Sequence, residues 1–288
     1  MNFAAASTED ADAAVTRQIV SRSKSSFTAG MRILPERRRR AIYAVYALCR
    51  AVDDIADGDA PGADSPADRA RLLDRWEEEI NRTSAGRPET AIGAEIARAR
   101  EHIDLPEGEF HLILEGMRMD AAAIIAPRSD RLEAYIRRVA GAVGILSMKC
   151  FGAWCGPPSK DFALNLATGL QLVNILRDVE TDARMGRLYI PAHILDTAGM
   201  PHDPHGAASH PNLPAAREAL GRDARTAFDA AKARIGAHRR LPLVPALMML
   251  GPYERLLLRW SDDWTRPPPR RSGWGKARDG LSTIARTF

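Results

Sequence analysis

The 288-residue sequence is sparing in several residue types, and each shortage excludes a class of protein. It has only three cysteines, Cys49, Cys150 and Cys155, an odd number without metal-ligand spacing, which fits a reducing compartment. No apolar run approaches the roughly 20 residues of a membrane span, and the longest, 241–251, contains two prolines. The N-terminus carries acids where a signal peptide needs positive charge. We therefore expect a cytoplasmic protein.

The excess of positive charge is also small. Lys and Arg number 41 against 37 Asp and Glu, which gives a net charge of +4. Such a balance favours an anionic substrate or lipid surface without requiring nucleic acid. The arginine clusters at 37–40 and 270–271 have no recognition motif or aromatic platform beside them, so we expect no nucleic-acid partner.

What the sequence does have is helical periodicity in almost every long segment, with no convincing strand pattern. The predicted helices span 9–22, 35–57, 66–84, 90–103, 106–123, 129–152, 159–184, 213–238 and 242–263. We interpret 199–214, with its three histidines, as a surface loop and 265–280 as a turn-rich excursion. No linker interrupts the pattern. The prediction is one all-α domain over 1–288, with 1–14 and 264–288 at its periphery.

One of these helices carries a stripe of oxygen-bearing side chains. In the segment QLVNILRDVETD (171–182), Asn174, Asp178 and Asp182 recur every four residues and therefore lie on one face. Two aspartates at this spacing repel each other by roughly 0.2–0.5 kcal/mol. We expect a positively charged partner to face them.

A second helix has a matching pair of acids. In YALCRAVDDIAD (46–57), Asp53 and Asp57 are one turn apart and present oxygens on a single face. Hard Mg²⁺ ions prefer oxygen ligands and are commonly held by one or two carboxylates plus substrate phosphates, so two such helices could clamp a diphosphate. Alternatively, Arg50 with Asp53 and Asp54 forms a solvated salt-bridge face. The apolar residues that flank both acidic segments favour the first interpretation.

Other residues near the acids suit the same chemistry. Guanidinium groups donate bidentately to phosphate oxygens, and the candidates are Arg50, Arg177 and Arg271. Gln171 and Asn174 share a face with Asp178 and can bind without charge. The glycines of VAGAVG (139–144) each cost about 1 kcal/mol of helix propensity. A close helix crossing and an opening for a long ligand both explain that cost, and the sequence does not decide between them.

Together these segments resemble the squalene/phytoene synthase family, the head-to-head trans-isoprenyl diphosphate synthases. The matching segments are SKSSF (23–27), LPERRRRAIYAVYALCRAVDDIAD (34–57), VAGAVG (139–144) and QLVNILRDVETDARMGRLYIP (171–191). The resemblance implies an isoprenoid-synthase-type helical bundle around a central hydrophobic cavity. It also implies that the two acidic helices line the mouth of this cavity and bind Mg²⁺ and diphosphate there.

The resemblance assigns roles to residues that match the family motifs. It implies a metal site made by Asp53, Asp57, Asn174, Asp178 and Asp182. It places Ser26, Phe27, Tyr46 and Arg50 beside the first substrate, Tyr135, Gln171 and Arg177 beside the second, and aligns Tyr253 and Arg271 with a Tyr and an Arg that hold diphosphate. Lys24 departs from the family pattern, since some members carry Ser there.

The implied reaction is the Mg²⁺-dependent joining of two farnesyl diphosphates to presqualene diphosphate, with release of diphosphate, for squalene and hopanoid biosynthesis. We expect no NADPH in this step, and downstream squalene-forming enzymes as partners. The joining of two geranylgeranyl diphosphates, as in phytoene synthases, is the alternative within the family. A reductive squalene synthase would need NADPH and usually a C-terminal membrane anchor, and we expect neither.

Two alternatives come from other classes. The segment DDIAD (53–57) also reads as the DDxxD motif of prenyl elongases and class I terpene cyclases. An elongase would repeat DDxxD, whereas a cyclase would have Ser or Thr at 178 and Glu at 182. The last alternative is a non-enzymatic basic helical protein that binds membranes or partner helices. For the enzyme, a peripheral contact with the inner face of the membrane is an expectation, because its product is long and oily, and the basic run 37–40 is expected to touch anionic lipid.

Overall fold

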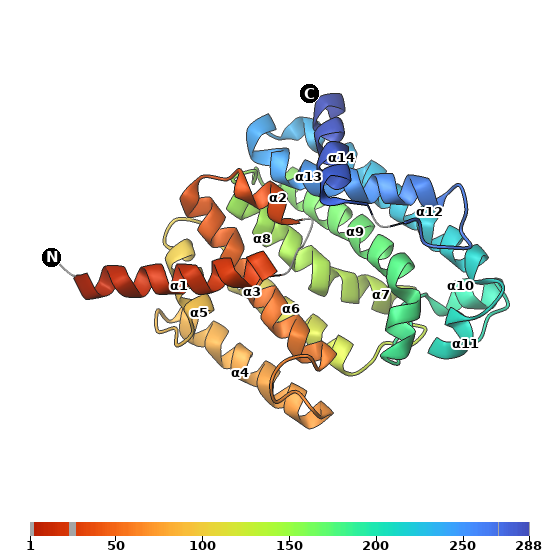
Figure 1. The fold of residues 1–288 in the computed structure, drawn as a ribbon, viewed down its shortest axis with the longest axis horizontal. Coiled ribbons are helices and arrows are strands. Elements are labelled where there is room, and N and C mark those ends of the chain that lie inside the picture. The colour runs from red at the N-terminus through yellow and green to blue at the C-terminus, as the bar shows by residue number, and fades with distance from the viewer. Residues whose placement is uncertain (1–2, 23–26, 270, 288) are drawn as a thin grey trace.

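The computed structural model describes residues 3–22, 27–269 and 271–287 (Figure 1). Its elements are α1 (Phe3–Arg22), α2 (Phe27–Arg32), α3 (Glu36–Asp57), α4 (Pro66–Ser84), α5 (Ala91–Arg100), α6 (Glu107–Ala121), α7 (Ser129–Ile136), the π-helix η1 (Arg137–Gly141), α8 (Ala142–Phe151), α9 (Pro157–Arg184), α10 (Ala192–Thr197), α11 (Pro204–Ala208), α12 (Leu213–Lys232), the 3-10 turn η2 (Ile235–Ala237), α13 (Arg240–Trp260) and α14 (Gly273–Thr287). Within these ranges the β-type pairing is one isolated bridge, Ile125 to Leu188. The predicted all-α class is confirmed.

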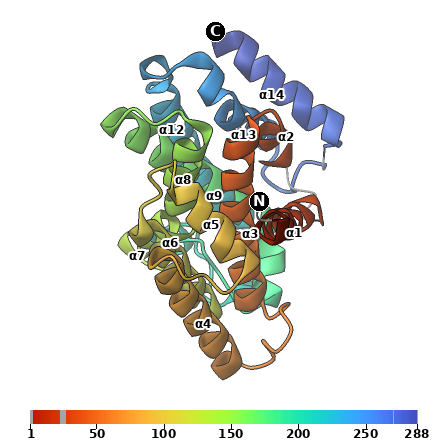
Figure 2. The ribbon, with the colours of Figure 1, turned by 90° about the vertical axis from the view of Figure 1, so that its left-hand side faces the viewer.

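The two acidic segments lie at the ends of long helices. Pro35 occupies the N-cap position of α3, and the helix ends where Gly58 adopts the left-handed conformation at φ 82° and its N–H donates to the Ile55 carbonyl. Helix α9 begins at Pro157, where a missing N–H costs nothing, and runs for 28 residues. It packs against α8, α12 and α13, while α3 packs against α1, α5, α6 and α8 (Figures 1 and 2). Asp57 and Asp182 therefore both fall within the last turn of their helices.

Several predicted boundaries were wrong. Residues 273–287 form α14 rather than a turn-rich excursion, and the predicted loop 199–214 contains the short helix α11. The single helix predicted over 129–152 is divided by the π-helix η1. Gly and Pro near the C-terminus suggested turns, but packing of α14 on α13 overrides that local preference.

Helix α13 bears on the expectation that no apolar run approaches the length of a membrane span. Its 21 residues are long and apolar enough to cross a bilayer by length and composition. Half of its apolar window, however, is buried inside the protein, and Pro245 and Pro252 lie within the helix. A core helix passes the same test, and α13 packs against α2, α12 and α14 as a core helix does.

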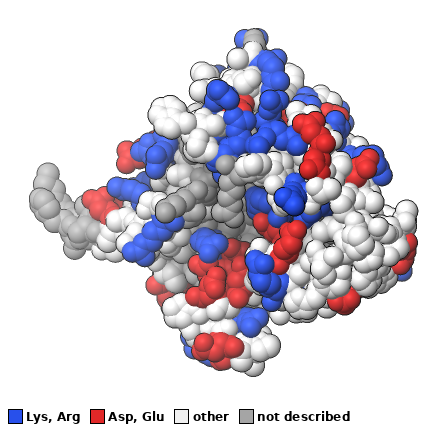
Figure 3. Space-filling view, turned by 45° about the vertical axis from the view of Figure 1, so that its right-hand side comes forward, with Lys and Arg blue, Asp and Glu red and all other residues white. Residues whose placement is uncertain are grey.

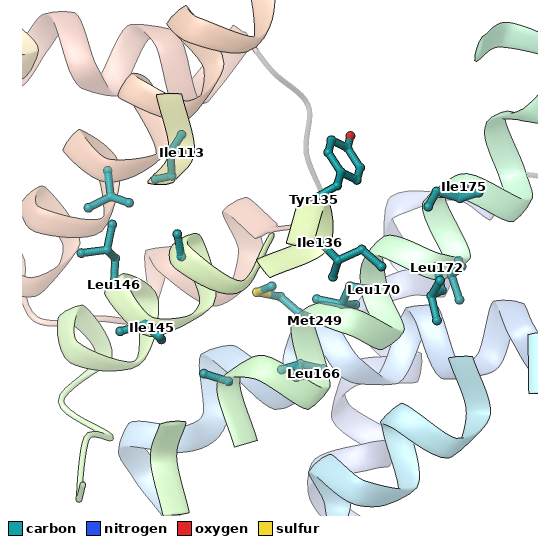
Figure 4. Packing of buried hydrophobic residues seen from close by; sticks show 14 of the residues in the cluster. Ile113, Tyr135, Ile136, Ile145, Leu146, Leu166, Leu170, Leu172, Ile175 and Met249 are labelled. Atoms are coloured by element: carbon teal, nitrogen blue, oxygen red, sulfur yellow. The ribbon is translucent and has the colours of Figure 1, made fainter. Parts of the chain in front are cut away.

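The crossing of α8 on α9 accounts for the glycines of VAGAVG. A Cβ added to Gly144 would lie 3.0 Å from the Ala163 carbonyl oxygen, and one added to Gly141 would lie 3.0 Å from Leu164 Cδ2. Gly144 also lines an apolar cavity of about 130 Å³ between η1, α8, α9 and α13. Figure 4 shows the side chains around this region, among them Leu166, Leu170 and Met249. The close crossing is therefore confirmed for both glycines, and the opening for a long ligand stays a prediction for Gly144.

Candidate active site

The first acidic cluster lies at the C-terminal end of α3. Arg50 Nη1 binds Asp53 Oδ2 at 2.8 Å, and its other terminal nitrogen contacts Asp54. Burial, followed by the negative charge of Asp57, raises the pKa of Asp53 to about 7, although Arg50 opposes that rise. The predicted salt bridge thus exists, but Arg50 does not offset the effect of burial and of the neighbouring acids on the pKa of Asp53.

Arg187 fixes the end of α3, and the sequence did not predict that role. Its Nη1 binds Asp57 Oδ1 at 2.6 Å, Nη2 donates to the Ala56 carbonyl at 3.0 Å, and Nε donates to the Asp120 carbonyl at 3.1 Å. The residue is only 7% exposed. Arg187 lies in the GRLYIP segment (186–191) just after α9, so it connects α3 and α6 to the segment after α9. The motif could have signalled it, but its partners lie far away in the sequence.

The second acidic cluster lies near the C-terminal end of α9. Arg177 Nε binds Asp178 Oδ1 at 2.8 Å and its Nη2 binds Oδ2 at 2.5 Å, so the expected cation comes from the same helix. Tyr253 of α13 hydrogen-bonds with Arg177. Asn174 Nδ2 donates to Gln171 Oε1 at 3.4 Å, while the buried Asn174 Oδ1 has no hydrogen-bond partner. A buried acceptor of this kind can accept from a water or coordinate a cation.

Arg187 connects the two clusters, because its backbone N–H donates to the Asp182 carbonyl at 2.8 Å and its side chain binds Asp57 at 2.6 Å. Burial is the largest cause that raises the pKa of Asp182 to about 7, followed by the charge of Asp178 on the same helix. The charges of Asp120 and of Asp57 raise it further, whereas that of Arg187 lowers it. Because Asp57 belongs to α3, acids of both helices contribute to one electrostatic site. Figure 3 shows acidic side chains gathered in a hollow of the surface with Lys and Arg around it.

A buried acid on α6, Asp120, lies behind this site and was missed by the sequence analysis. Its Oδ1 accepts the Tyr189 hydroxyl at 2.5 Å and its Oδ2 accepts the Tyr135 hydroxyl at 3.1 Å. The two rings stack with centroids 5.1 Å apart. Burial raises the pKa of Asp120 to about 6 even though both hydroxyls and Arg187 lower it. In Figure 4 the Tyr135 hydroxyl points away from the apolar side chains.

Four other predicted residues are not brought to the acidic clusters by any contact described. Ser26 lies outside the described residues, and Phe27 begins α2 but its side chain is not described. Tyr46 is partly buried against the core and has an interaction partner. Arg271 pairs with Asp279 of α14, Nη1 to Oδ2 at 3.0 Å. That pair lies between α13 and α14 rather than on either acidic helix.

The donor set suits a magnesium ion that arrives with phosphate. In the described part of the chain, no group of three or more His, Cys, Asp or Glu side chains could hold a metal ion by itself. Mg²⁺ keeps several waters and takes one or two carboxylates plus substrate phosphates, so it does not need such a cage. The candidate ligand atoms on α3 and α9 are carboxylate and amide oxygens. One of them is Asn174 Oδ1, which has no hydrogen-bond partner. The residues present fit Mg²⁺.

An all-α fold whose two acidic helices share one electrostatic site beside an apolar cavity defines the class of isoprenoid synthases. The comparison with known proteins narrows this class. The family model of the squalene/phytoene synthases matches residues 20–263, and the chain belongs to that family of prenyltransferases, which act on prenyl diphosphates. The predicted family is therefore confirmed, and the elongase, cyclase and non-enzymatic alternatives are set aside.

Individual relatives add detail. The chain is 36% identical to a presqualene diphosphate synthase of Zymomonas mobilis over 247 residues, which cover 84% of this chain and 82% of that one. It is 35% identical to a 15-cis-phytoene synthase of Synechococcus elongatus over 186 residues, 61% of this chain and 59% of that one. A crystal structure of a dehydrosqualene synthase superposes with a TM-score of 0.83 at 22% identity, covering 96% and 97% of the two chains. This last similarity supports the fold.

Proposed function

We propose that this chain joins two molecules of farnesyl diphosphate head to head to form presqualene diphosphate. The observation that carries the proposal is the shared electrostatic site of Asp57 on α3 and Asp182 on α9, next to an apolar cavity. The similarity to the Zymomonas mobilis presqualene diphosphate synthase extends over 84% of the chain and supports the choice of reaction. The phytoene synthase match is shorter, at 61%.

The acids and arginines would hold the two diphosphate groups. The residues that would hold Mg²⁺ are Asp53, Asp57, Asn174, Asp178 and Asp182. When bound, Mg²⁺ offsets the negative charge that develops on the departing diphosphate. Arg50 and Arg177 already lie beside these acids and can donate to phosphate oxygens bidentately. Crowded carboxylates with raised pKa values favour the arrival of cations, which relieves their repulsion.

The apolar cavity would receive the first part of a prenyl tail, and at about 130 Å³ it would have to widen to hold both tails. It is lined by Gln171 and Asn174 at the acidic end and by Phe151 and Phe162 at the other. Phe162 and Asn174 are twelve residues apart on α9, which corresponds to about 18 Å along the helix. Apolar walls exclude water, so an allylic cation formed there meets the second double bond rather than a hydroxyl group.

The bond changes follow from this arrangement. The C1–O bond of one farnesyl diphosphate breaks, and C1 adds to the 2,3-double bond of the other molecule. Loss of one proton from carbon then closes the cyclopropane ring. Tyr135 is held as a neutral phenol, because burial and then the charge of Asp120 raise its pKa well above the ordinary value. A neutral phenol is a poor base, so the released diphosphate would accept the proton, while the Tyr135 hydroxyl donates to Asp120 at 3.1 Å.

The direct test is incubation of the purified protein with farnesyl or geranylgeranyl diphosphate and Mg²⁺, with and without NADPH, followed by mass analysis. We expect a C30 cyclopropyl diphosphate from farnesyl diphosphate, formed equally well without NADPH. Faster turnover of geranylgeranyl diphosphate, or a product that forms only with NADPH, would reject the proposal. If the proposal holds, downstream squalene-forming enzymes in the cytoplasm would consume the cyclopropyl diphosphate.

A further inference from the structure

Helix α14 presents large apolar side chains to the outside. Trp274, Arg278 and Leu281 occupy positions i, i+4 and i+7 and therefore share one face of the helix. Trp274 is 89% exposed and Leu281 is 59% exposed. Single exposed apolar residues are ordinary, but a tryptophan and a leucine on either side of an arginine form a patch. Figure 2 shows α14 on the outside of the molecule, at the end opposite α4.

A basic groove of about 320 Å³ continues this patch onto α13. It contains Arg255 and the 40% exposed Leu258 from α13, together with Arg278 and Arg286 from α14. Among the ion pairs described for this chain, none joins Arg255, Arg278 or Arg286 to a carboxylate. The groove therefore presents three arginines that have no acidic partner within the described residues.

The two acids of the groove are already neutralised by other cations. Glu254 binds Lys232 at 2.6 Å, and Asp279 binds Arg271 at 3.0 Å. These pairs leave the groove with a net positive charge. Basic side chains gather near the top of Figure 3, the level at which Figure 1 places α13 and α14.

This surface is held firmly to the rest of the molecule. A Cβ added to Gly251 would lie 2.7 Å from the Asp279 carbonyl oxygen, and one added to Gly280 would lie 3.1 Å from Met248 Cα. The two backbones therefore approach closely at their crossing. Thr283 on the inner face of α14 is buried there as well. Because the inner face of α14 packs closely on α13, the residues on its opposite face are held facing outward.

We propose that the α13/α14 face, defined by Arg255, Leu258, Trp274, Arg278, Leu281 and Arg286, docks the protein onto an anionic lipid bilayer. Apolar side chains of an interfacial helix enter the boundary between headgroups and acyl chains, and tryptophan prefers that depth. Arginines around them bind the headgroup phosphates. The charge and the apolar patch occur on the same surface, which is the combination that a lipid surface recognises.

The arginine run 37–40, the sequence-based expectation for lipid contact, fits this role less well. Arg38 donates to the carbonyls of Lys149 and Cys150 at 3.2 and 3.1 Å, and Arg40 binds Glu95 at 2.9 and 2.7 Å. Two of the four arginines in this run are thus bound to groups of the protein itself. Docking through α13 also places lipid near the cavity, because α13 contributes Ala246 and Met249 to the cavity wall.

Vesicle flotation tests the proposal without any measurement of turnover, so its outcome is independent of the proposed reaction. The vesicles are phosphatidylcholine alone, or phosphatidylcholine with phosphatidylglycerol, at about 0.1 M and about 0.5 M salt. The variants are W274A/L281S and R255Q/R278Q. The matched control is R75Q/R87Q, which removes two exposed arginines on and after α4, a helix that packs against α3, α5 and α6. Circular dichroism establishes that each variant is folded.

We expect the wild type to bind the anionic vesicles at low salt and to lose most of that binding at high salt. The loss of each arginine should weaken partitioning about fivefold, so R255Q/R278Q should lose about 25-fold. W274A/L281S should lose at least tenfold, and the control should bind like the wild type. Absence of binding to anionic vesicles, equal binding to neutral vesicles, or an equal loss in R75Q/R87Q would each overturn the proposal.

Discussion

The two acidic helices carry acids at the same spacing but hold them differently. On α3, Asp57 is bound by Arg187, which lies 130 positions later in the chain. On α9, Asp178 is bound by Arg177, the preceding residue, and Asp182 has no ion pair among those described. The last acid of α3 is therefore fixed by tertiary contacts, whereas the last acid of α9 remains available.

This difference shows that the site contains one carboxylate held in place by an arginine and others whose negative charge is not neutralised. Arg187 orients one carboxylate before any ligand arrives, which reduces the cost of ordering it on binding. Asp53 and Asp182 instead have pKa values raised to about 7, because burial and neighbouring acids disfavour their charged forms. A magnesium diphosphate would relieve that repulsion on both helices at once.

The largest expected effect tests whether both helices serve one reaction. We expect D53A and D178A each to lower kcat by about a thousandfold, since each removes a group that would stabilise charge on the leaving diphosphate. The double variant should be little worse than either single one, because residues that act as a unit are not additive. The measurement is the initial rate of farnesyl diphosphate consumption.

Asp54 provides the matched control for this experiment. It neighbours Asp53 and contacts Arg50, but it lies one step around the helix. D54A should keep activity within about tenfold of the wild type. Losses in D53A and D178A that multiply in the double variant would mean two independent sites and would contradict a shared one.

A smaller effect is expected from Arg187, which acts through Asp57. R187Q removes the ion pair to Asp57 and the bonds to the Ala56 and Asp120 carbonyls. We expect kcat/KM to fall about 10–100-fold, with a comparable rise in the Mg²⁺ concentration needed for half-maximal rate. A titration of Mg²⁺ at saturating substrate measures that change.

R184Q is the control for R187Q, because Arg184 is exposed and bonds only to Thr181 Oγ1 among the contacts described. It should leave the Mg²⁺ requirement unchanged. If R187Q lowers stability but not the apparent affinity for Mg²⁺, Arg187 is a structural residue and does not position Asp57 for the metal.

The contrast between the helices also separates what the sequence could predict from what it could not. Spacing of four residues placed Asp53 with Asp57, and Asp178 with Asp182, because helix geometry fixes local neighbours. Arg187 and Asp120 escaped prediction since their partners lie 15 to 131 residues away and periodicity carries no information on such contacts. Asp120 also sits among apolar residues of α6, where only the folded chain reveals the two tyrosine hydroxyls.

The same reason explains the outcome for the fold. Helical periodicity predicted most of the helices and the all-α class, since amphipathic faces are local features of the sequence. It failed at α14, where Gly273, Gly275 and Gly280 suggested turns. Two of the close contacts that stabilise this helix, at Gly251 and Gly280, belong to the crossing with α13. Close approach of two backbones is a tertiary property. At this crossing glycine stabilises the packing of α14 on α13, because a side chain would separate the two helices.

The smallest expected effect distinguishes the last acids of the two helices in the metal-free protein. D57A leaves the buried Arg187 without its carboxylate, at a cost of about 1–3 kcal/mol, so Tm should fall by several degrees. D182A removes a carboxyl whose pKa is raised from 3.8 to about 7 in the folded state. The folded state binds that proton more tightly than the unfolded state, so stability is lost as pH rises between these values, and D182A should restore it.

Thermal unfolding at several pH values, in a chelator, measures both changes. D182A should have a higher Tm than the wild type at about pH 8, and the difference should shrink as the pH falls and vanish near pH 3, below the unfolded-state pKa of 3.8, where the carboxyl is mostly protonated in both states. D57A should be less stable than the wild type at about pH 8. If both variants shift Tm in the same direction at that pH, the two acids are held alike, and Arg187 does not distinguish the helices. A D182A difference that persists unchanged at about pH 3 would instead mean that packing, rather than charge, accounts for its effect.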